Sequence, residues 1–255
     1  MFRDFILLLS MMSRIPVIIP QETVAEERAR SWRLLPAWGL LLGVLVAGIM
    51  GVIATLGHPL AAAAGVGAGV ILTGGIQFKQ VMNLSQGFSV RKDAVQMLVN
   101  MKPSRYGLTA IVTGIILIFL KFGLYLQLLQ NGQVWWMLVA AFVFSRFAMT
   151  FAVGFFPPTL YAGQGKLIQQ NFKKQYFVFS FCLTVALFCL FGKFEFAVGA
   201  ALSFLTVYFF CKTWTRRLYG LNEDCYGAIA EWGEVFFLLF CLMYNHLLSF
   251  ANIFY

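Results

Sequence analysis

The sequence has very few of the side chains on which most catalytic and metal sites depend. Its 255 residues include only ten Asp and Glu and two His, and charged residues make up 11% of the chain. A soluble domain carries roughly 25% charged residues, so an ordinary soluble domain is excluded. The two histidines, His58 and His246, lie far from the polar segments described below. We therefore expect neither a zinc site nor a histidine base.

Cysteine is also scarce, and the signatures of the common nucleotide-binding folds are absent. The five cysteines have no CxxC spacing, which favours buried small apolar side chains over a disulfide framework or a metal site. They are Cys182, Cys189, Cys211, Cys225 and Cys241. The sequence contains no P-loop, no GxGxxG after a strand and no tandem repeat.

The chain is instead rich in apolar residues, which make up 60% of it and include 28 Phe. Several windows reach about 20 apolar residues, the length that spans a bilayer. The sequence predicts an all-α, polytopic membrane bundle, a single domain over 1–255. We expect about seven transmembrane helices, near 34–57, 60–76, 108–130, 134–153, 176–192, 194–211 and 233–252. The second contains AAAAGVGAGVILTGG, and small residues let helices approach closely, so we expect it at the bundle centre.

Residues 1–33 are expected to lie on the cytoplasmic side of the membrane. The apolar run between Arg3 and Arg14 is too short to cross a bilayer and has no small-residue cleavage site, so we expect a retained interfacial helix. Basic residues concentrate here and in alternate loops, which predicts a cytoplasmic N-terminus. The net charge of +9 follows from this asymmetry and from attraction to lipid. The lipid bilayer, and no nucleic acid, is therefore the expected partner of this charge.

The polar residues gather in three predicted cytoplasmic segments, 77–107, 154–174 and 212–234. In the last, Asp224, Glu231 and Glu234 stand at offsets that share one helical face. Ionisable groups at membrane depth face a cavity, a partner or a metal. Two interpretations stay open: the acids pair with Arg216 and Arg217, or they hold a cation or cationic group.

Three further basic residues each have two interpretations. Arg146 lies inside a predicted span. It either pairs with Glu231 or Glu234 in a structural role, or it binds a phosphate-bearing substrate. Arg105 lies where the chain re-enters the membrane, where it snorkels to headgroups or binds phosphate. Lys166 belongs to a basic loop that favours topology signal and lipid contact over a ligand site.

Seven segments, in their order, resemble one known family. They are SRIPV (13–17), LLPAWGLLLG (34–43), TGG (73–75), MKPSRYG (101–107), SR (145–146), GQGK (163–166) and EDCYGAIAEWGE (223–234). Together they resemble the membrane-bound cobalamin synthases, the adenosylcobinamide-GDP ribazoletransferases. The last segment is the most specific, because it is similar to the family ending GDxLGAxxExxE over almost its whole length.

The resemblance implies an inner-membrane enzyme that joins adenosylcobinamide-GDP to α-ribazole or its phosphate and releases GMP, with Mg²⁺. It implies corrinoid and nucleotide small molecules as ligands, and a membrane complex with other corrinoid enzymes. The catalytic residues that it implies are Asp224, Glu231, Glu234, Arg105, Ser104 and Arg146. The substrate-binding residues that it implies are Gly74, Gly75, Gln77, Lys79, Asn83, Gln86 and Lys166.

The chain departs from the family pattern at its main acidic motif, TGGxHxDGxADxxDG. Gln77 stands at the position of its His, and the three Asp positions hold Lys79, Asn83 and Gln86. Pro103 replaces the acid of the MxDSR segment. A lysine is no ligand for Mg²⁺, and the two amides offer only neutral oxygens. We therefore assign no metal ligand in this sequence, and Mg²⁺ is implied by the family alone.

Three functional interpretations remain open. The chain is a working but divergent ribazoletransferase, or an inactive relative that binds a corrinoid, a nucleotide or a membrane partner. In the third interpretation it is a small membrane transporter. The polar residues collect at one face of the predicted bundle rather than near the midplane, which disfavours a transporter.

Overall fold

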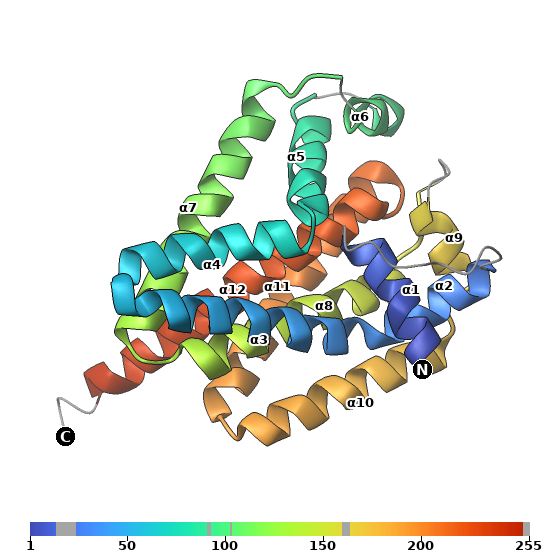
Figure 1. Ribbon diagram of the computed structural model, residues 1–255. Coiled ribbons are helices and arrows are strands. Elements are labelled where there is room, and N and C mark those ends of the chain that lie inside the picture. The colour runs from blue at the N-terminus through green and yellow to red at the C-terminus, as the bar shows by residue number, and fades with distance from the viewer. Residues whose placement is uncertain (14–23, 91–92, 103, 160–163, 252–255) are drawn as a thin grey trace.

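A computed structural model describes residues 1–13, 24–90, 93–102, 104–159 and 164–251, and within them the protein is helical, with a lone bridge between Pro158 and Leu221. The helices of residues 1–100 are α1 (Phe2–Met12), α2 (Ala25–Ser31), α3 (Leu35–Ile53), α4 (His58–Leu72), α5 (Ile76–Phe88) and α6 (Ala94–Asn100). The remaining helices are α7 (Leu108–Gln130), α8 (Val139–Phe155), α9 (Gln164–Gln170), α10 (Lys174–Phe191), α11 (Phe194–Leu218) and α12 (Glu223–Ala251) (Figure 1). A 3₁₀ turn (Trp32–Leu34) precedes α3, and a π-helical turn (Val134–Leu138) precedes α8.

The described residues contain six helices that are long and apolar enough to cross a membrane, and one bent pair that passes the same test together. The six correspond to six of the seven predicted spans, so the prediction of a polytopic helical bundle is confirmed. The last span differs most in its bounds, because α12 begins at Glu223 rather than near residue 233. The acidic segment is therefore the first part of a membrane helix and not a separate loop.

The predicted span 60–76 is the bent pair. Its helix α4 has only 15 residues, and α5 leaves it at an angle of 87° (Figure 1). Gly74 and Gly75 both adopt positive φ angles, 63° and 67°, which glycine reaches at no steric cost. The Gly75 N–H donates to the carbonyl of Val70 at 2.7 Å and closes the turn. The TGG sequence thus turns the polar strip away from α4 as a helix of its own.

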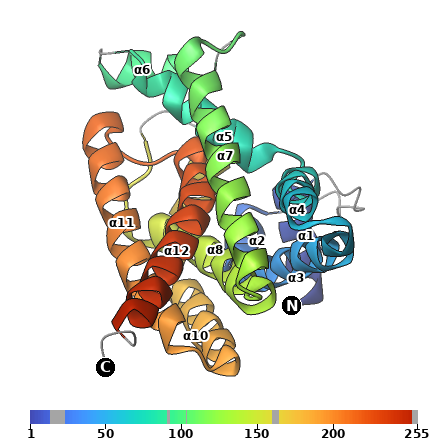
Figure 2. The same ribbon diagram turned by 90° about the vertical axis from the view of Figure 1, so that its left-hand side faces the viewer.

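The centre of the bundle is α8, and the prediction that the Gly/Ala-rich helix lies there is wrong. Every residue from 139 to 153 in α8 is buried, whereas α4 buries only Ala61, Ala62, Gly65 and Val66. In Figure 2, α3, α10, α11 and α12 lie around α8. The small residues of α4 serve a one-sided contact, since a Cβ at Gly65 would collide with Met50 of α3.

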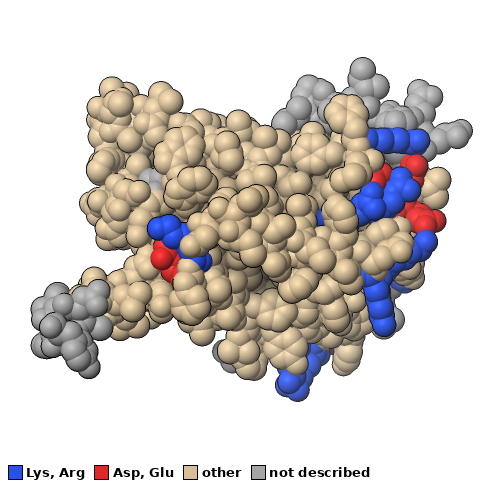
Figure 3. Space-filling model, turned by 90° about the horizontal axis from the view of Figure 1, so that it is seen from below, with Lys and Arg blue, Asp and Glu red and all other residues tan. Residues whose placement is uncertain are grey.

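The outer helices present apolar side chains to their surroundings. On α7, Ile111, Ile115 and Phe119 are exposed, whereas Gly114 and Leu117 on its other face are buried. Figure 3 shows that most of the charged side chains on the face viewed lie at its right-hand end, with smaller groups at the left and at the lower edge, and that most of this face carries none. This pattern fits helices that contact lipid. On α10 it also exposes Cys182 and Cys189, so only the other three cysteines are buried as expected.

The close approach of α3 to α8 yields a test of the packing. A Cβ at Gly39 would collide with the Phe142 carbonyl oxygen and lie 3.0 Å from Cγ of Arg146. We expect Gly39→Ala to lower the free energy of unfolding by about 3 kcal/mol, because a backbone oxygen cannot yield as a side chain does. Thermal unfolding in detergent micelles measures this change.

Gly67→Ala on α4 is the matched control, because nothing lies within 4 Å of a Cβ built there. We expect this variant to unfold at or slightly above the wild-type temperature, since alanine favours a helix over glycine. Equal unfolding temperatures for Gly39→Ala and Gly67→Ala would contradict the close approach of α3 and α8.

Candidate functional site

The polar strip on α5 is fastened to its neighbours by its amide side chains. Gln77 accepts a hydrogen bond at its Oε1 from Nη2 of Arg146 on α8, at 2.8 Å. Asn83 donates from its Nδ2 to Oδ1 of Asp224 on α12 in a buried hydrogen bond of 2.9 Å. Inside a membrane protein a buried polar group without a partner is costly, so these bonds hold α5 firmly against α8 and α12.

The amide oxygens further along α5 are engaged as well. The Tyr106 hydroxyl donates to Oδ1 of Asn83 at 2.8 Å, and the Gly107 N–H donates to Oε1 of Gln86 at 2.9 Å. Both donors precede α7. The three amides thus connect α5 to three other helices, and each of their carbonyl oxygens accepts a hydrogen bond from the protein itself.

A pocket of about 440 Å³ opens beside this strip. It lies at the first turns of α5 and α12, and α1, α9 and α8 complete its wall. Its polar lining comes from Lys79, Gln80 and Asn83 of α5 and from Glu223 and Asp224 of α12. Lys79 is exposed and forms no ion pair with the described residues. The pocket therefore combines one ammonium group with two carboxylates.

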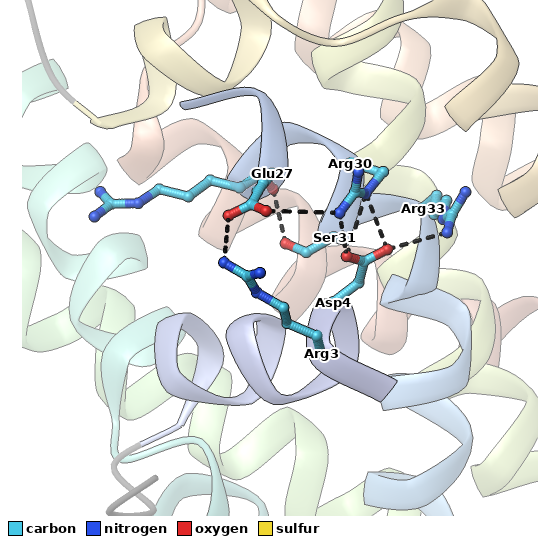
Figure 4. Close-up of polar contacts among 7 residues, drawn as sticks. Arg3, Asp4, Glu27, Arg30, Ser31 and Arg33 are labelled. Atoms are coloured by element: carbon cyan, nitrogen blue, oxygen red, sulfur yellow. Dashed lines mark hydrogen bonds and ion pairs between the residues drawn. The ribbon is translucent and has the colours of Figure 1, made fainter. Parts of the chain in front are cut away.

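The N-terminal segment forms part of the pocket wall through Met11 and Met12 of α1 and through Trp32. Asp4 fastens α1 in this position. Its buried carboxylate accepts hydrogen bonds from Arg30 at 2.8 Å and from Arg33 at 3.0 Å (Figure 4). Burial raises the pKa of Asp4, but the hydrogen bonds and charges of the two arginines outweigh it and hold the pKa below its usual range.

Comparison with known proteins identifies the family. The family model described as cobalamin-5-phosphate synthase matches residues 4–242. The chain belongs to this family. A relative named adenosylcobinamide-GDP ribazoletransferase from Brevibacillus brevis is 30% identical, over 92% of this chain and 96% of its own length. Relatives of the same name from Desulfitobacterium hafniense and Clostridium kluyveri are 28% and 29% identical, and cover 92% of this chain. No solved structure matches the chain significantly.

The protein is thus a multi-pass membrane member of the cobalamin-5-phosphate synthase family. Its pocket brings together several of the site residues that the sequence predicts. Those that line the pocket are Gly74, Gly75, Lys79, Asn83 and Asp224. Lys166 directly follows Gly165, which also lines it. Gln77 and Gln86 fasten α5 instead. Ser104 and Arg105 are exposed and do not line the pocket.

Some of the sequence motifs lie outside the described residues. These are most of SRIPV, Pro103 of MKPSRYG and the first residue of GQGK, Gly163. The other family motifs lie within the described residues: LLPAWGLLLG (34–43), TGG (73–75), Ser145 and Arg146, and EDCYGAIAEWGE (223–234), with the rest of MKPSRYG and of GQGK.

The two other predicted catalytic acids, Glu231 and Glu234, lie apart from Asp224. Both form ion pairs with Lys121 of α7, at 3.1 Å for Glu234, and Glu234 also accepts a hydrogen bond from the Tyr125 hydroxyl. The three acids share a helical face, as predicted. However, offsets of seven and ten residues separate Glu231 and Glu234 from Asp224 by about 10 and 15 Å along the axis, so one ion cannot bridge all three.

The expected arginine partners of these acids are also corrected. Among the described residues, Arg216 and Arg217 pair with none of the three, and Arg217 instead lies over the ring of Phe88. Arg146 bonds to Gln77 and Ser145 rather than to an acid of α12. The ion-pair partner of Glu231 and Glu234 is Lys121, which lies inside the predicted span 108–130. The sequence places this lysine in a membrane span, but it does not indicate which helix packs against it.

The donor set on α5 does not fit a protein-held Mg²⁺. This ion prefers carboxylate oxygens in a near-octahedral arrangement. Three positions on α5 hold Asp in the family pattern. The first holds Lys79, whose ammonium group repels a metal ion. The other two hold Asn83 and Gln86, whose amide oxygens already accept hydrogen bonds from the protein. The Asn83 N–H₂ group faces Asp224, so it occupies the side on which a metal would approach that carboxylate. Nor do any three His, Cys, Asp or Glu of the described residues cluster as metal ligands.

Sequence reasoning missed part of the pocket. Glu223 directly precedes the nominated Asp224, and its carboxylate accepts a hydrogen bond from the Gly165 N–H at 3.2 Å. Gln80 directly follows the predicted site residue Lys79. Both missed residues are therefore sequence neighbours of predicted ones, and this proximity could have indicated them. Trp32 and Tyr226 also line the pocket. They come from segments far apart in the sequence, and no pattern in either segment marks them as neighbours.

The bond between Asn83 and Asp224 predicts the effect of restoring an acid. We expect Asn83→Asp to lower the free energy of unfolding by about 3 kcal/mol, because it places two carboxylates in contact and removes a buried donor. Millimolar Mg²⁺ is expected to recover part of the loss, since a divalent ion neutralises the new carboxylate pair. Thermal unfolding with Mg²⁺ or EDTA measures both effects.

The control is Gln86→Glu, which keeps the side-chain oxygen that accepts a hydrogen bond from the Gly107 N–H. An Asn83→Asp variant as stable in EDTA as the wild type would contradict this role.

The buried charges around Lys121 predict a second stability effect. Lys121→Met leaves Glu231 and Glu234 without their shared cation, and we expect it to lower the free energy of unfolding by about 4 kcal/mol. Lys121→Arg keeps the charge and is expected to lose less. Adding Glu231→Gln to Lys121→Met is expected to restore part of the stability, as a double-mutant cycle measures. Simple additivity of the two changes would show that the ion pair does not exist.

Proposed function

We propose that this chain is a working transferase that joins adenosylcobinamide-GDP to α-ribazole or its phosphate and releases GMP. The carrying observation is the composition of the pocket. It is formed by the TGG turn, by α5 and by the start of α12, the segments that hold the family motifs. The names of the relatives, which span nearly the whole chain, support the same reaction.

The reaction needs positive charge where the diphosphate binds. A hydroxyl oxygen of the ribazole attacks the corrinoid-side phosphorus, the bond to the bridging oxygen breaks, and GMP leaves with the negative charge. Lys79 lies in the pocket without an ion-pair partner among the described residues and suits this charge. The N-terminal turn of α5, which begins at the same wall, adds the positive end of a helix dipole.

The attacking hydroxyl must also lose its proton. Asp224 is the pocket carboxylate suited to accept it, because the Asn83 N–H₂ donor holds one of its oxygens in a fixed position. Such orientation of a general base is a recurrent device in enzymes. In this mechanism Lys79 binds the diphosphate, Asn83 orients Asp224, and Asp224 takes the proton.

The proposal places the protein in the inner membrane with its N-terminus in the cytoplasm. The pocket then opens toward the cytoplasm, where nucleotide-activated substrates are found. The helix α2, which ends directly before the pocket residue Trp32, carries Arg28 and Arg30, and basic residues suit that side. The corrinoid and the nucleotide are the small-molecule partners. A complex with other corrinoid enzymes of the membrane would hand over the activated corrinoid.

A second candidate is binding of the corrinoid nucleotide without turnover. It is favoured by one observation, the replacement of three motif acids by Lys79, Asn83 and Gln86. An inactive member would keep the pocket and lose the chemistry. A transfer assay separates the two candidates.

The assay uses membranes that contain the full chain, adenosylcobinamide-GDP and α-ribazole phosphate, with Mg²⁺ or with EDTA. We expect GMP and the joined corrinoid in equal amounts, and we expect the reaction to continue in EDTA because α5 offers no carboxylate to a metal. Lys79→Met is expected to lower the rate about a hundredfold, the usual effect of removing one charge-stabilising donor. Lys212→Met on α11, which does not line the pocket, is the control.

The outcomes discriminate clearly. Bound substrate without product in the wild type would favour the inactive candidate. Product from the wild type with an unchanged rate for Lys79→Met would remove Lys79 from the mechanism. Movement of a solute through liposomes that carry the purified protein, with no transfer reaction, would favour a transporter.

A further inference from the structure

Two aromatic side chains in the pocket wall bury hydrogen-bond donors that have no partner among the described residues. The indole N–H of Trp32 and the hydroxyl of Tyr226 are out of contact with solvent, and neither finds an acceptor among the described residues. The side chains are only 4% and 1% exposed. Both line the same pocket as Lys79.

Unpaired buried donors are rare in folded proteins, because burial removes the water that would otherwise accept from them. The two donors here are also held rigidly. The rings of Trp32 and Tyr226 meet edge to face with their centroids 5.7 Å apart. Trp32 lies between Arg30 and Arg33, which bind Asp4, and Tyr226 lies in the second turn of α12. Their positions are therefore set before any ligand arrives.

The carboxylates of the pocket do not serve these donors. Glu223 accepts from the Gly165 N–H, and Asp224 accepts from Asn83. Beside these carboxylates and the amide of Gln80, three groups of the pocket-lining residues are donors: the ammonium group of Lys79, the indole N–H and the phenol O–H. A ligand that satisfies them must carry several acceptor oxygens and negative charge. Phosphate oxygens meet both requirements.

We propose that Trp32 and Tyr226 bind substrate by donating hydrogen bonds to phosphate oxygens of its diphosphate, beside the charge of Lys79. The inference rests on the proposed function for the identity of the substrate. It deepens that function by adding two binding residues, Trp32 from outside the family motifs and Tyr226 from within the EDCYGAIAEWGE segment. The aromatic pair forms a preformed cradle, and the diphosphate supplies the acceptors that the described part of the free protein does not provide.

A binding role for Trp32 and Tyr226 leads to a different prediction from a purely structural role. Tyr226→Phe and Trp32→Phe each remove a donor that has no acceptor among the described residues of the free protein. Neither substitution therefore breaks a hydrogen bond that stabilises the described part of the ligand-free protein. We expect Tyr226→Phe to unfold at or above the wild-type temperature. We expect each variant to bind a nucleoside diphosphate about tenfold more weakly, the value of one hydrogen bond to a charged group.

The matched control for the tryptophan is Trp38→Phe on α3. Trp38 is fully buried and its indole N–H also lacks a partner among the described residues, but it does not line the pocket. Trp38→Phe therefore makes the same chemical change and a similar packing defect elsewhere. It is expected to leave ligand affinity at the wild-type value.

The experiment measures binding of GDP, inorganic pyrophosphate and guanosine to the full chain in lipid nanodiscs, by calorimetry in EDTA. We expect GDP and pyrophosphate to bind and guanosine to bind far more weakly. Both cradle variants are expected to lose affinity for the first two probes. Wild-type affinity in Tyr226→Phe and Trp32→Phe would overturn the inference, as would a wild type that binds guanosine as tightly as GDP.

The same variants in the transfer assay separate this inference from the proposed function. We expect a raised KM for adenosylcobinamide-GDP, with a smaller change in kcat. Product formation with an unchanged KM in both variants would overturn the cradle and leave the transferase standing. Diphosphate binding that depends on Trp32 and Tyr226, in a wild type that forms no product, would support the cradle and overturn the transferase.

Discussion

The hydrogen bond between Asn83 and Asp224 is the interaction on which the rest of the site depends. It joins α5 to α12 at the floor of the pocket, and both residues line that pocket. The amide supplies a donor where two acids would repel one another. It therefore holds the two helices together without a metal ion, leaves Asp224 oriented, and lets Lys79 present its charge to a ligand.

The same requirement recurs throughout the membrane bundle, because a buried charge must find a partner of opposite sign or move to water. Glu231 and Glu234 share Lys121, and Asp4 lies between Arg30 and Arg33. The first pairing joins α7 to α12, which are distant in sequence, and the second joins α1 to α2 and to the turn that precedes α3. Together they fix the relative positions of the helices around the pocket, which packing of apolar side chains in lipid does not do alone.

Much of the fold could be predicted from the sequence, because the length of an apolar run and the position of basic residues are local properties. The right-angle turn at Gly74 and Gly75 could not, since TGG is equally compatible with the end of a straight span. Composition also misplaced the bundle centre. Small residues show that α4 permits close contact on one face, but only the three-dimensional structure shows that the bulky α8 is enclosed on all sides. Of the site, the α5 and α12 residues were visible in motifs, whereas Trp32 and Tyr226 meet only through folding.

An experimental structure of the full chain with adenosylcobinamide-GDP, determined in EDTA, tests the central claim most directly. The account predicts the diphosphate in the pocket beside Lys79, with its oxygens in hydrogen-bonding distance of Trp32 and Tyr226 and with Asn83 still donating to Asp224. A substrate bound elsewhere, or an Asn83 side chain turned away from Asp224 around a bound divalent ion, would contradict it.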